Sequence, residues 1–324
     1  MTEKNPASVS GEFRTRPLKK EYDEWFRPDE LYIGSLPDMQ NAEVESIAGA
    51  RVPIFEVGSS NFRLPMKYRR GDGREEVYEM RGTGAVSLSD RHKGINMSRI
   101  IRILYQNQTE VMDFVGIGKV LQAFLKELES DRARLKLQFA YPIWQQSLRS
   151  DLGGYQYYDV ALEGTQWRDG DFRRVIHFDF VYSSACPCST ELSEHARDLR
   201  DSFTIPHSQR SKARISVALR PGRELSLEEL RDLAAGALMT ETQVMVKRVD
   251  EQAFAELNGA YPKFVEDAAR LLYRALDEEP AIEDFQVACA HLESLHSHDA
   301  VAVIHKGIPG GFDGSGVDYG TLVC

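Results

Sequence analysis

The order of the predicted strands and helices repeats: two strands, two helices and two strands occur in each half of the 324-residue chain. In the first half, apolar periodicity predicts strands at 52–57, 75–88, 135–148 and 155–167, around helices at 97–106 and 115–128. In the second half, it predicts strands at 172–183, 212–219, 285–293 and 300–304, around helices at 226–239 and 262–276. The chain is therefore expected to be an α+β protein of two β-β-α-α-β-β modules, with antiparallel sheets covered by paired helices.

The second half shows these periods clearly. Residues 175–180 alternate between two faces, as in a strand, although both faces carry apolar groups. The helix expected from Pro262 has proline at its first position and places Phe264, Ala268 and Leu272 on one face. Open edges of such sheets favour association with other subunits, so we expect a homo-oligomer.

Composition divides the chain into four parts. Residues 1–45 are charged and lack a steady apolar period, which predicts an N-terminal extension. The two modules are expected at 46–168 and 169–306. Residues 307–324 are rich in glycine, and this composition favours a mobile tail.

The charge and hydropathy limit the possible functions. With 40 basic and 50 acidic residues the formal net charge is −10, so a broad nucleic-acid surface is not expected. No apolar run approaches the roughly 20 residues that cross a bilayer. The segment from Met1 to Ser10 is too polar for a secretory signal. We therefore expect a cytoplasmic protein with neither a membrane nor a nucleic-acid partner.

The cysteines are too few and too scattered for a disulfide-stapled fold. Cys186 and Cys188 flank Pro187 directly after a predicted strand. Either thiol could be a metal ligand or a nucleophile. Taken alone, each is equally compatible with a small residue packed in a turn.

Further polar clusters lie in the second half of the chain. His207 stands in a loop before a predicted strand, where an ordinary surface residue is the simplest interpretation. Residues 247–251 bring two bases and two acids together, as a solvated surface also would. The segment 293–299 includes His296 and His298 in one turn. Cysteine, histidine and carboxylate suit a divalent ion such as Zn²⁺, Mn²⁺ or Fe²⁺, but a hydrolytic and a structural metal both remain open.

Several short motifs occur in a fixed order along the chain. In the second half they are Cys-Pro-Cys-Ser at 186–189, His-Ser-Gln-Arg-Ser at 207–211, Lys-Arg-Val-Asp-Glu at 247–251, Phe-Val-Glu-Asp at 264–267 and Glu-Ser-Leu-His-Ser-His-Asp at 293–299. Earlier motifs are Leu-Pro-Asp-Met-Gln-Asn at 36–41 and Lys-Gly-Ile-Asn-Met-Ser-Arg at 93–99. Together they resemble the type IB GTP cyclohydrolases, and the resemblance extends from about residue 36 to 305.

This resemblance implies a bimodular tunnelling fold, whose subunits assemble around barrels, commonly as homotetramers with sites near subunit interfaces. It implies conversion of GTP and water to 7,8-dihydroneopterin triphosphate and formate, the first step of tetrahydrofolate (pterin) biosynthesis. The family's metal ligands match Cys186, His207, Glu251 and His296. These side chains would hold a divalent metal, Mn²⁺, Zn²⁺ or Fe²⁺, that activates water for attack at C8 of guanine.

The resemblance also implies residues that bind the substrate. Glu266 matches the carboxylate that anchors guanine, where it can accept two hydrogen bonds and reject adenine. The triphosphate requires basic side chains within an acidic protein. Arg210 and Lys247 are the preferred pair, and Arg99 of the first module is a further candidate.

Ring opening and rearrangement of the ribose also require proton transfer. Beside Cys186, the catalytic candidates are Cys188 and His298, as proton shuttles. The alternatives without a catalytic role are a packed side chain for Cys188 and a hydrogen bond that stabilises the turn for His298.

The chain departs from the family pattern in two places. Between Cys186 and His207 there are 20 residues, a longer spacing than in many members, and 190–203 is predicted to be an inserted helix, either a lid or a surface excursion. Asn96 stands where the family often has histidine. The alternatives that stay open are a cyclic phosphate product, a nicotinamide-dependent nitrile reductase, and a non-catalytic scaffold stabilised by metal.

Overall fold

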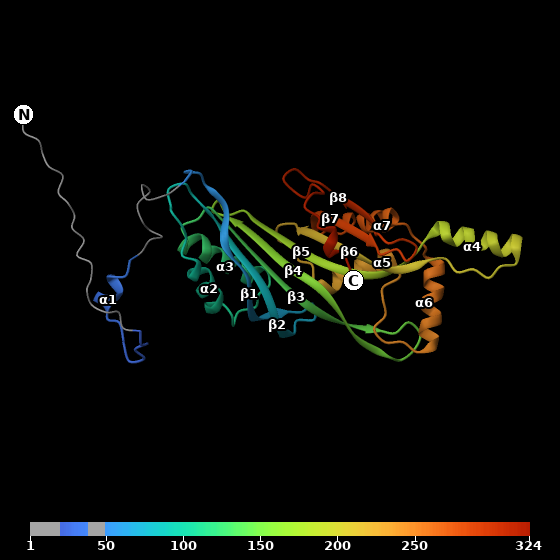
Figure 1. Cartoon of the computed structure of the whole chain (residues 1–324), viewed down its shortest axis with the longest axis horizontal. Helices are drawn as coiled ribbons and strands as arrows, with labels where there is room; N and C mark the ends of the chain where they lie inside the picture. The colour runs from blue at the N-terminus through green and yellow to red at the C-terminus, as the bar shows by residue number, and fades with distance from the viewer. Residues whose placement is uncertain (1–19, 38–48) are drawn as a thin grey trace, which may run out of the picture. The chain divides into compact units, whose positions relative to one another are not determined.

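The computed structural model describes residues 20–37 and 49–324, and the chain divides into two compact units at Met39 (Figure 1). The smaller unit contains helix α1 (Glu30–Gly34), whose first turn is capped by the side chain of Asp29. The extension predicted at 1–45 lies partly outside the described residues. The same holds for the motif at 36–41.

The larger unit is built on one antiparallel sheet of eight strands in chain order. The strands are β1 (Ile54–Arg69), β2 (Glu75–Leu88), β3 (Arg132–Gln146), β4 (Gly153–Trp167), β5 (Phe172–Ala185), β6 (Ser208–Leu219), β7 (Ile282–His291) and β8 (Ala300–His305). The helices are α2 (Met97–Gln106), α3 (Phe114–Glu127), α4 (Pro187–Arg200), α5 (Leu227–Leu238), α6 (Arg248–Ala260) and α7 (Val265–Asp277). This order confirms the α+β class and the repeated β-β-α-α-β-β pattern, with α4 and α6 added in the second half.

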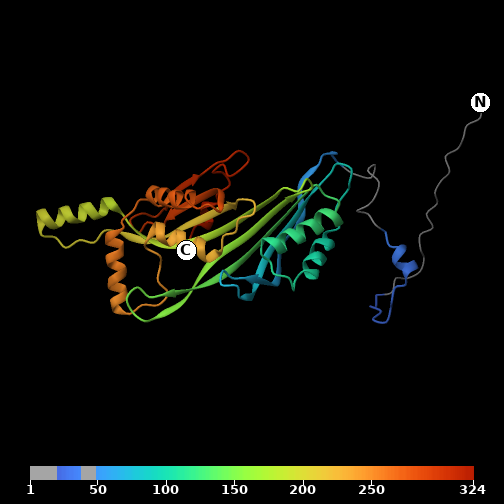
Figure 2. The same ribbon diagram turned by 180° about the vertical axis from the view of Figure 1, so that it is seen from behind.

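The core lies between the sheet and its helices. Alternate residues of β3 are buried, among them Leu135, Leu137 and Phe139, as the two-residue period of a strand requires. Helices α2 and α3 lie beside the first four strands, and α5 and α7 lie beside the last four (Figures 1 and 2). Because β4 pairs with β5, the two modules share one sheet, and the predicted boundary between 46–168 and 169–306 stays a prediction.

Helix α4 confirms that the segment between Cys186 and His207 contains a helix, although it begins at Pro187 rather than residue 190. That this segment is an insertion stays a prediction. Proline suits this position because the first turn of a helix needs no backbone donor there. Only Ser193 of α4 is buried, and the helix projects away from the sheet in both views (Figures 1 and 2). Within 20–37 and 49–324, no helix has the length and apolar character needed to cross a membrane.

Two expectations about element bounds are wrong. Strand β1 continues to Arg69, far beyond the predicted end at residue 57, because exposed polar side chains interrupt its apolar pattern. Its proline, Pro65, is tolerated because β1 is an edge strand. Helix α7 begins at Val265, so Pro262 precedes the helix instead of occupying its first position.

The glycine-rich C-terminal segment is attached to the sheet. The carboxylate of Asp284, on β7, accepts hydrogen bonds from the backbone N–H of Gly307 (3.0 Å) and Phe312 (2.6 Å). Gly307 has a φ of 76°, which a residue with a side chain rarely adopts. Leu322 is only 1% exposed. The expectation of a mobile tail is therefore wrong, since the glycines provide turns rather than freedom.

We expect Asp284→Ala to release this segment. Two partly buried N–H groups lose a charged acceptor, and a hydrogen bond to a charged group contributes about 1.5–3 kcal/mol, so amide protection at residues 307–316 should fall by at least about tenfold. Hydrogen–deuterium exchange with mass spectrometry measures this directly. The control is Asp318→Ala, because within the described residues the carboxylate of Asp318 accepts the backbone N–H of Gly320, outside this range. Unchanged exchange in Asp284→Ala would show that the segment is held by other contacts.

Candidate active site

Three of the predicted ligands come from chain segments that meet at one end of the sheet. Strand β5 ends where β6 begins, so antiparallel pairing brings Cys186 beside His207. The backbone N–H of Cys186 donates to the carbonyl of His207 at 3.2 Å. The loop that carries His296 reaches the same end, because Ser294 Oγ donates to the carbonyl of Ser208 at 3.3 Å.

The fourth predicted ligand, Glu251, lies in the first turn of α6, and buried Asp250 fixes that turn. The Asp250 carboxylate accepts the backbone N–H groups of Arg149 and Ser150, each at 2.8 Å, and that of Lys247 at 2.7 Å. It also accepts the Ser150 hydroxyl at 2.6 Å. Burial alone would raise the pKa of this carboxyl, but the hydrogen bonds outweigh burial and hold its pKa well below the usual range. The β3–β4 hairpin therefore positions Glu251.

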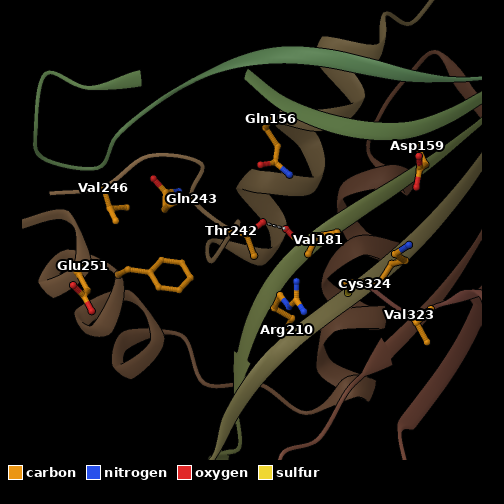
Figure 3. Close-up of a pocket in the computed structure, with 12 residues that line it drawn as sticks. Gln156, Asp159, Val181, Arg210, Thr242, Gln243, Val246, Glu251, Val323 and Cys324 are labelled. Atoms are coloured by element: carbon orange, nitrogen blue, oxygen red, sulfur yellow. Dashed lines mark hydrogen bonds between the residues drawn. The ribbon is translucent and has the colours of Figure 1, made fainter. Parts of the chain in front are cut away.

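A pocket of about 840 Å³ lies between the sheet and α6 (Figure 3). It brings Arg210 of β6 and Glu251 of α6 to one cavity. The other lining residues are Gln156, Asp159, Val181, Lys212, Thr242, Gln243, Val246, Phe254, Val323 and Cys324. Buried Oε1 of Gln243 has no donor in the part of the chain that the structure describes. The pocket thus offers the basic side chains of Arg210 and Lys212 beside carboxylates, which suits a ligand with both anionic groups and N–H donors.

Glu266 is exposed in the first turn of α7, at the same end of the sheet. The segment before it is anchored by Lys263, whose backbone N–H donates to the carbonyl of Ala185 at 3.0 Å. The Lys263 ammonium is buried and donates to Thr240 Oγ1 (3.1 Å) and to the carbonyl of Tyr261 (2.6 Å). Desolvation lowers the pKa of Lys263 to about 8. Glu266 is therefore held near the end of β5.

Two of the predicted phosphate-binding residues lie outside the pocket. Lys247 Nζ pairs with Asp151 Oδ1 at 2.8 Å on the surface. Arg99, on α2, donates to the carbonyl of Glu127 at 2.9 Å in the first module. A single chain does not bring either side chain to Arg210, so their roles stay predictions.

The predicted proton shuttles, Cys188 and His298, lie on different segments of the chain. Cys188 is exposed in the first turn of α4. His298 stacks on His296 with ring centroids 4.8 Å apart, and His296 Nε2 lies 3.8 Å from Glu293 Oε2. Among the described residues, no three Cys, His, Asp or Glu side chains are grouped closely enough to hold a metal ion. The predicted donors fit a divalent ion in chemical type, but they lie apart in this chain.

The sequence analysis missed three residues that build the site: Asp250, Lys263 and Gln209. Asp250 follows Lys247 by three residues and accepts its backbone N–H, a helix-start pattern that the sequence carries. Gln209 lies within the motif at 207–211, but no function was predicted for its side chain. The burial of Lys263 depends on contacts with distant segments, at Thr240 and at Ala185, which no local pattern of the sequence indicates.

The eight-stranded antiparallel sheet and its paired helices define the class: a bimodular α+β protein in which the β-β-α-α-β-β order occurs twice, with a pocket beside the sheet. A family model described as type I GTP cyclohydrolase folE2 matches residues 36–302. The chain therefore belongs to this family.

Relatives support the same assignment. The GTP cyclohydrolase FolE2 of Cereibacter sphaeroides (strain ATCC 17025 / ATH 2.4.3) is 52% identical over 302 residues, covering 93% of this chain and 82% of the relative. That of Paracoccus denitrificans is 50% identical over 307 residues, covering 95% and 94%. Among solved structures, a uricase from Arthrobacter globiformis has a TM-score of 0.43 at 10% identity, covering 82% of this chain and 96% of that chain. A TM-score this low carries no functional information.

Proposed function

We propose that the protein is a metal-dependent GTP cyclohydrolase. It converts GTP and water to 7,8-dihydroneopterin triphosphate and formate, at the entry to tetrahydrofolate (pterin) biosynthesis. The observation that carries this proposal is the meeting, at one end of the sheet, of Cys186, His207, Arg210 and the helix start that bears Glu266. Membership of the folE2 family supports GTP as the substrate.

Cys186, His207, Glu251 and His296 are the proposed metal ligands, for Mn²⁺, Zn²⁺ or Fe²⁺. When bound, such an ion supplies the Lewis acidity that makes water nucleophilic toward C8 of guanine. Cys186 is the N-cap of α4, and its side chain makes no capping hydrogen bond, so the thiol is available. The N-terminus of a helix also favours negative charge.

We assign substrate binding to Glu266 at the start of α7 and to basic residues of the pocket. Glu266 would accept the N1–H and N2–H donors of guanine, and no partner in the described chain competes for its carboxylate. Arg210 supplies positive charge for the triphosphate. Lys212 contributes as well: it lies 3.4 Å from Asp179, whose carboxylate is already bound by Arg214 at 2.8 and 2.7 Å.

The remaining steps need proton transfer, which we assign to Cys188 and His298. Cys188 is exposed one residue beyond the proline that follows Cys186, and His298 stacks on the proposed ligand His296. Both side chains are therefore open to a bound substrate at this end of the sheet.

We further propose a cytoplasmic homo-oligomer, a dimer of dimers, with its sites near subunit interfaces. Three features support this assembly. The edge strands β1 and β8 each pair with one other strand in the described chain, and β1 makes one further bridge, between Lys67 and Val111. The projecting arm formed by α4 and the segment after it exposes Leu199 and Phe203. Finally, Arg99 and Lys247 do not line the pocket of their own chain, so we assign any phosphate contact they make to the site of a neighbouring subunit.

Product identity tests the proposed reaction. Purified protein incubated anaerobically with GTP and Mn²⁺, Zn²⁺ or Fe²⁺ is expected to yield a pterin with the mass of 7,8-dihydroneopterin triphosphate. The mass of a cyclic phosphate would instead assign the alternative product. Absence of turnover with every metal, in a folded oligomer, would favour the non-catalytic scaffold.

A further inference from the structure

Gln209 lies between the proposed ligand His207 and two buried serines. Gln209 Oε1 is 3.1 Å from His207 Nδ1, and Gln209 Nε2 donates to Ser184 Oγ at 2.6 Å. Ser184 Oγ in turn lies 2.8 Å from Ser211 Oγ. Both serines have no exposed surface, so water does not replace the hydrogen bond between them, whereas His207 and Gln209 are half-buried. A continuous chain of hydrogen bonds thus runs from the imidazole into the sheet.

Strand pairing sets this chain of contacts. Ser184 of β5 lies directly opposite Gln209 of β6, and Tyr182 lies opposite Ser211. Directly opposed residues have their Cβ atoms about 5 Å apart, which is the reach of a glutamine amide and a serine hydroxyl. His207 is also held from the other side, because its backbone N–H donates to Ser189 Oγ at 3.1 Å.

The orientation of the Gln209 amide determines which ring nitrogen of His207 carries the proton. A neutral imidazole has one N–H donor and one acceptor nitrogen. Because the amide NH₂ is directed to Ser184, the carbonyl Oε1 faces His207 and accepts a hydrogen bond from Nδ1–H. Nε2 then keeps its lone pair. With the amide reversed, an N–H would face Nδ1, the proton would move to Nε2, and Nε2 could not bind a metal.

We propose that Gln209 is a positioning residue that keeps the proton of His207 on Nδ1 and leaves Nε2 free for the divalent ion. This inference rests on the proposed function, because it takes His207 as a metal ligand. Partners of this kind fix the tautomer and the ring orientation of a ligating histidine, and their loss typically weakens metal binding 10- to 100-fold.

Two substitutions at this position separate hydrogen bonding from packing. Gln209→Met keeps the length of the side chain and removes both hydrogen bonds. Gln209→Glu keeps an acceptor toward Nδ1 and removes the NH₂ group, so it cannot present a donor to the ring. Gln166→Met is the control, because the Gln166 amide likewise makes two hydrogen bonds, donating to the carbonyls of Gly170 and Asp171, away from the proposed metal ligands.

The readout is Zn²⁺ affinity of the full-length protein, measured by competition with a chromophoric chelator. We expect Gln209→Met to bind Zn²⁺ about 10- to 100-fold more weakly than wild type. Gln209→Glu and Gln166→Met should stay within about threefold of wild type, a span of under 0.7 kcal/mol. Wild-type affinity in Gln209→Met would overturn this inference alone. Failure of wild type itself to bind any of the three metals would overturn the proposed function as well.

A second measurement needs no substitution at Gln209, so a folding defect cannot obscure it. NMR of the ¹⁵N-histidine-labelled protein distinguishes protonated from unprotonated ring nitrogens, and His207→Asn identifies the signal. The spectra are recorded at about pH 9, where an ordinary imidazole is neutral and only the tautomer is compared. We expect the proton of the neutral His207 ring to lie on Nδ1 in the metal-free protein, with Nε2 unprotonated. A proton on Nε2 would contradict the inference.

Discussion

We expect Cys186→Ala to lose almost all formate release. Its kcat should fall by at least about 1,000-fold, which corresponds to an increase of about 4 kcal/mol in activation free energy. The thiolate is the only soft ligand among the four proposed ones, so its loss removes both a donor and a negative charge from the metal site. The fold should persist, because the contact that pairs Cys186 with His207 is made by the backbone. Formate assay, metal analysis and circular dichroism together check this prediction.

The control for this variant is Cys289→Ala, which removes a fully buried thiol of β7. It should cost stability through a small cavity but leave metal content and turnover per folded molecule close to wild type. Cys186→Ala that retains its metal and turns over GTP at the wild-type rate would exclude Cys186 as a ligand.

The second large effect is expected from Glu266→Gln. This substitution should lower kcat/KM for GTP by about 10³- to 10⁴-fold. A site that hydrogen-bonds its substrate through a carboxylate loses this much when the partner is mismatched. The amide brings an N–H toward the N1–H and N2–H donors of guanine, so one contact becomes repulsive. Steady-state kinetics with GTP, and with inosine triphosphate, which lacks the N2 amino group, measure both the loss and the reduced preference for guanine.

Stability should not change in Glu266→Gln, because the exposed side chain has no hydrogen-bond partner within the described chain. Glu278→Gln, at the other end of α7, is the matched control and should keep wild-type kinetics. Unaltered kcat/KM in Glu266→Gln would remove this residue from the substrate site.

The local pattern of apolar residues in the sequence predicted much of the fold. Strand β2 and helix α2 occur at their predicted bounds, because their apolar residues follow the two-residue and 3.6-residue periods. The apolar residues of strand β1 do not follow the two-residue period, so its full length was not predicted. The start of α6 was interpreted as a charged surface cluster, so this helix was not predicted. The single eight-stranded sheet depends on pairing between β4 and β5, which no local pattern reveals.

Part of the candidate site was predicted from the sequence and part was not, again because local patterns do not reveal contacts between distant segments. Motifs identified Cys186, His207 and Glu266, and strand order explains why these segments meet. The contacts that hold them are distant in sequence: Asp250 bonds residues about 100 positions earlier, and Lys263 bonds the end of β5. Distance in sequence also explains the error about the C-terminal segment, whose anchor is Asp284.

The most direct measurement follows the fate of C8 of guanine. Protein is incubated anaerobically with GTP labelled with ¹³C at C8, with and without Mn²⁺, Zn²⁺ or Fe²⁺. We expect one labelled formate for each pterin formed, only with metal present, and none from Cys186→Ala. Label retained in a purine product, or full turnover in metal-free protein, would contradict a metal-dependent attack of water at C8.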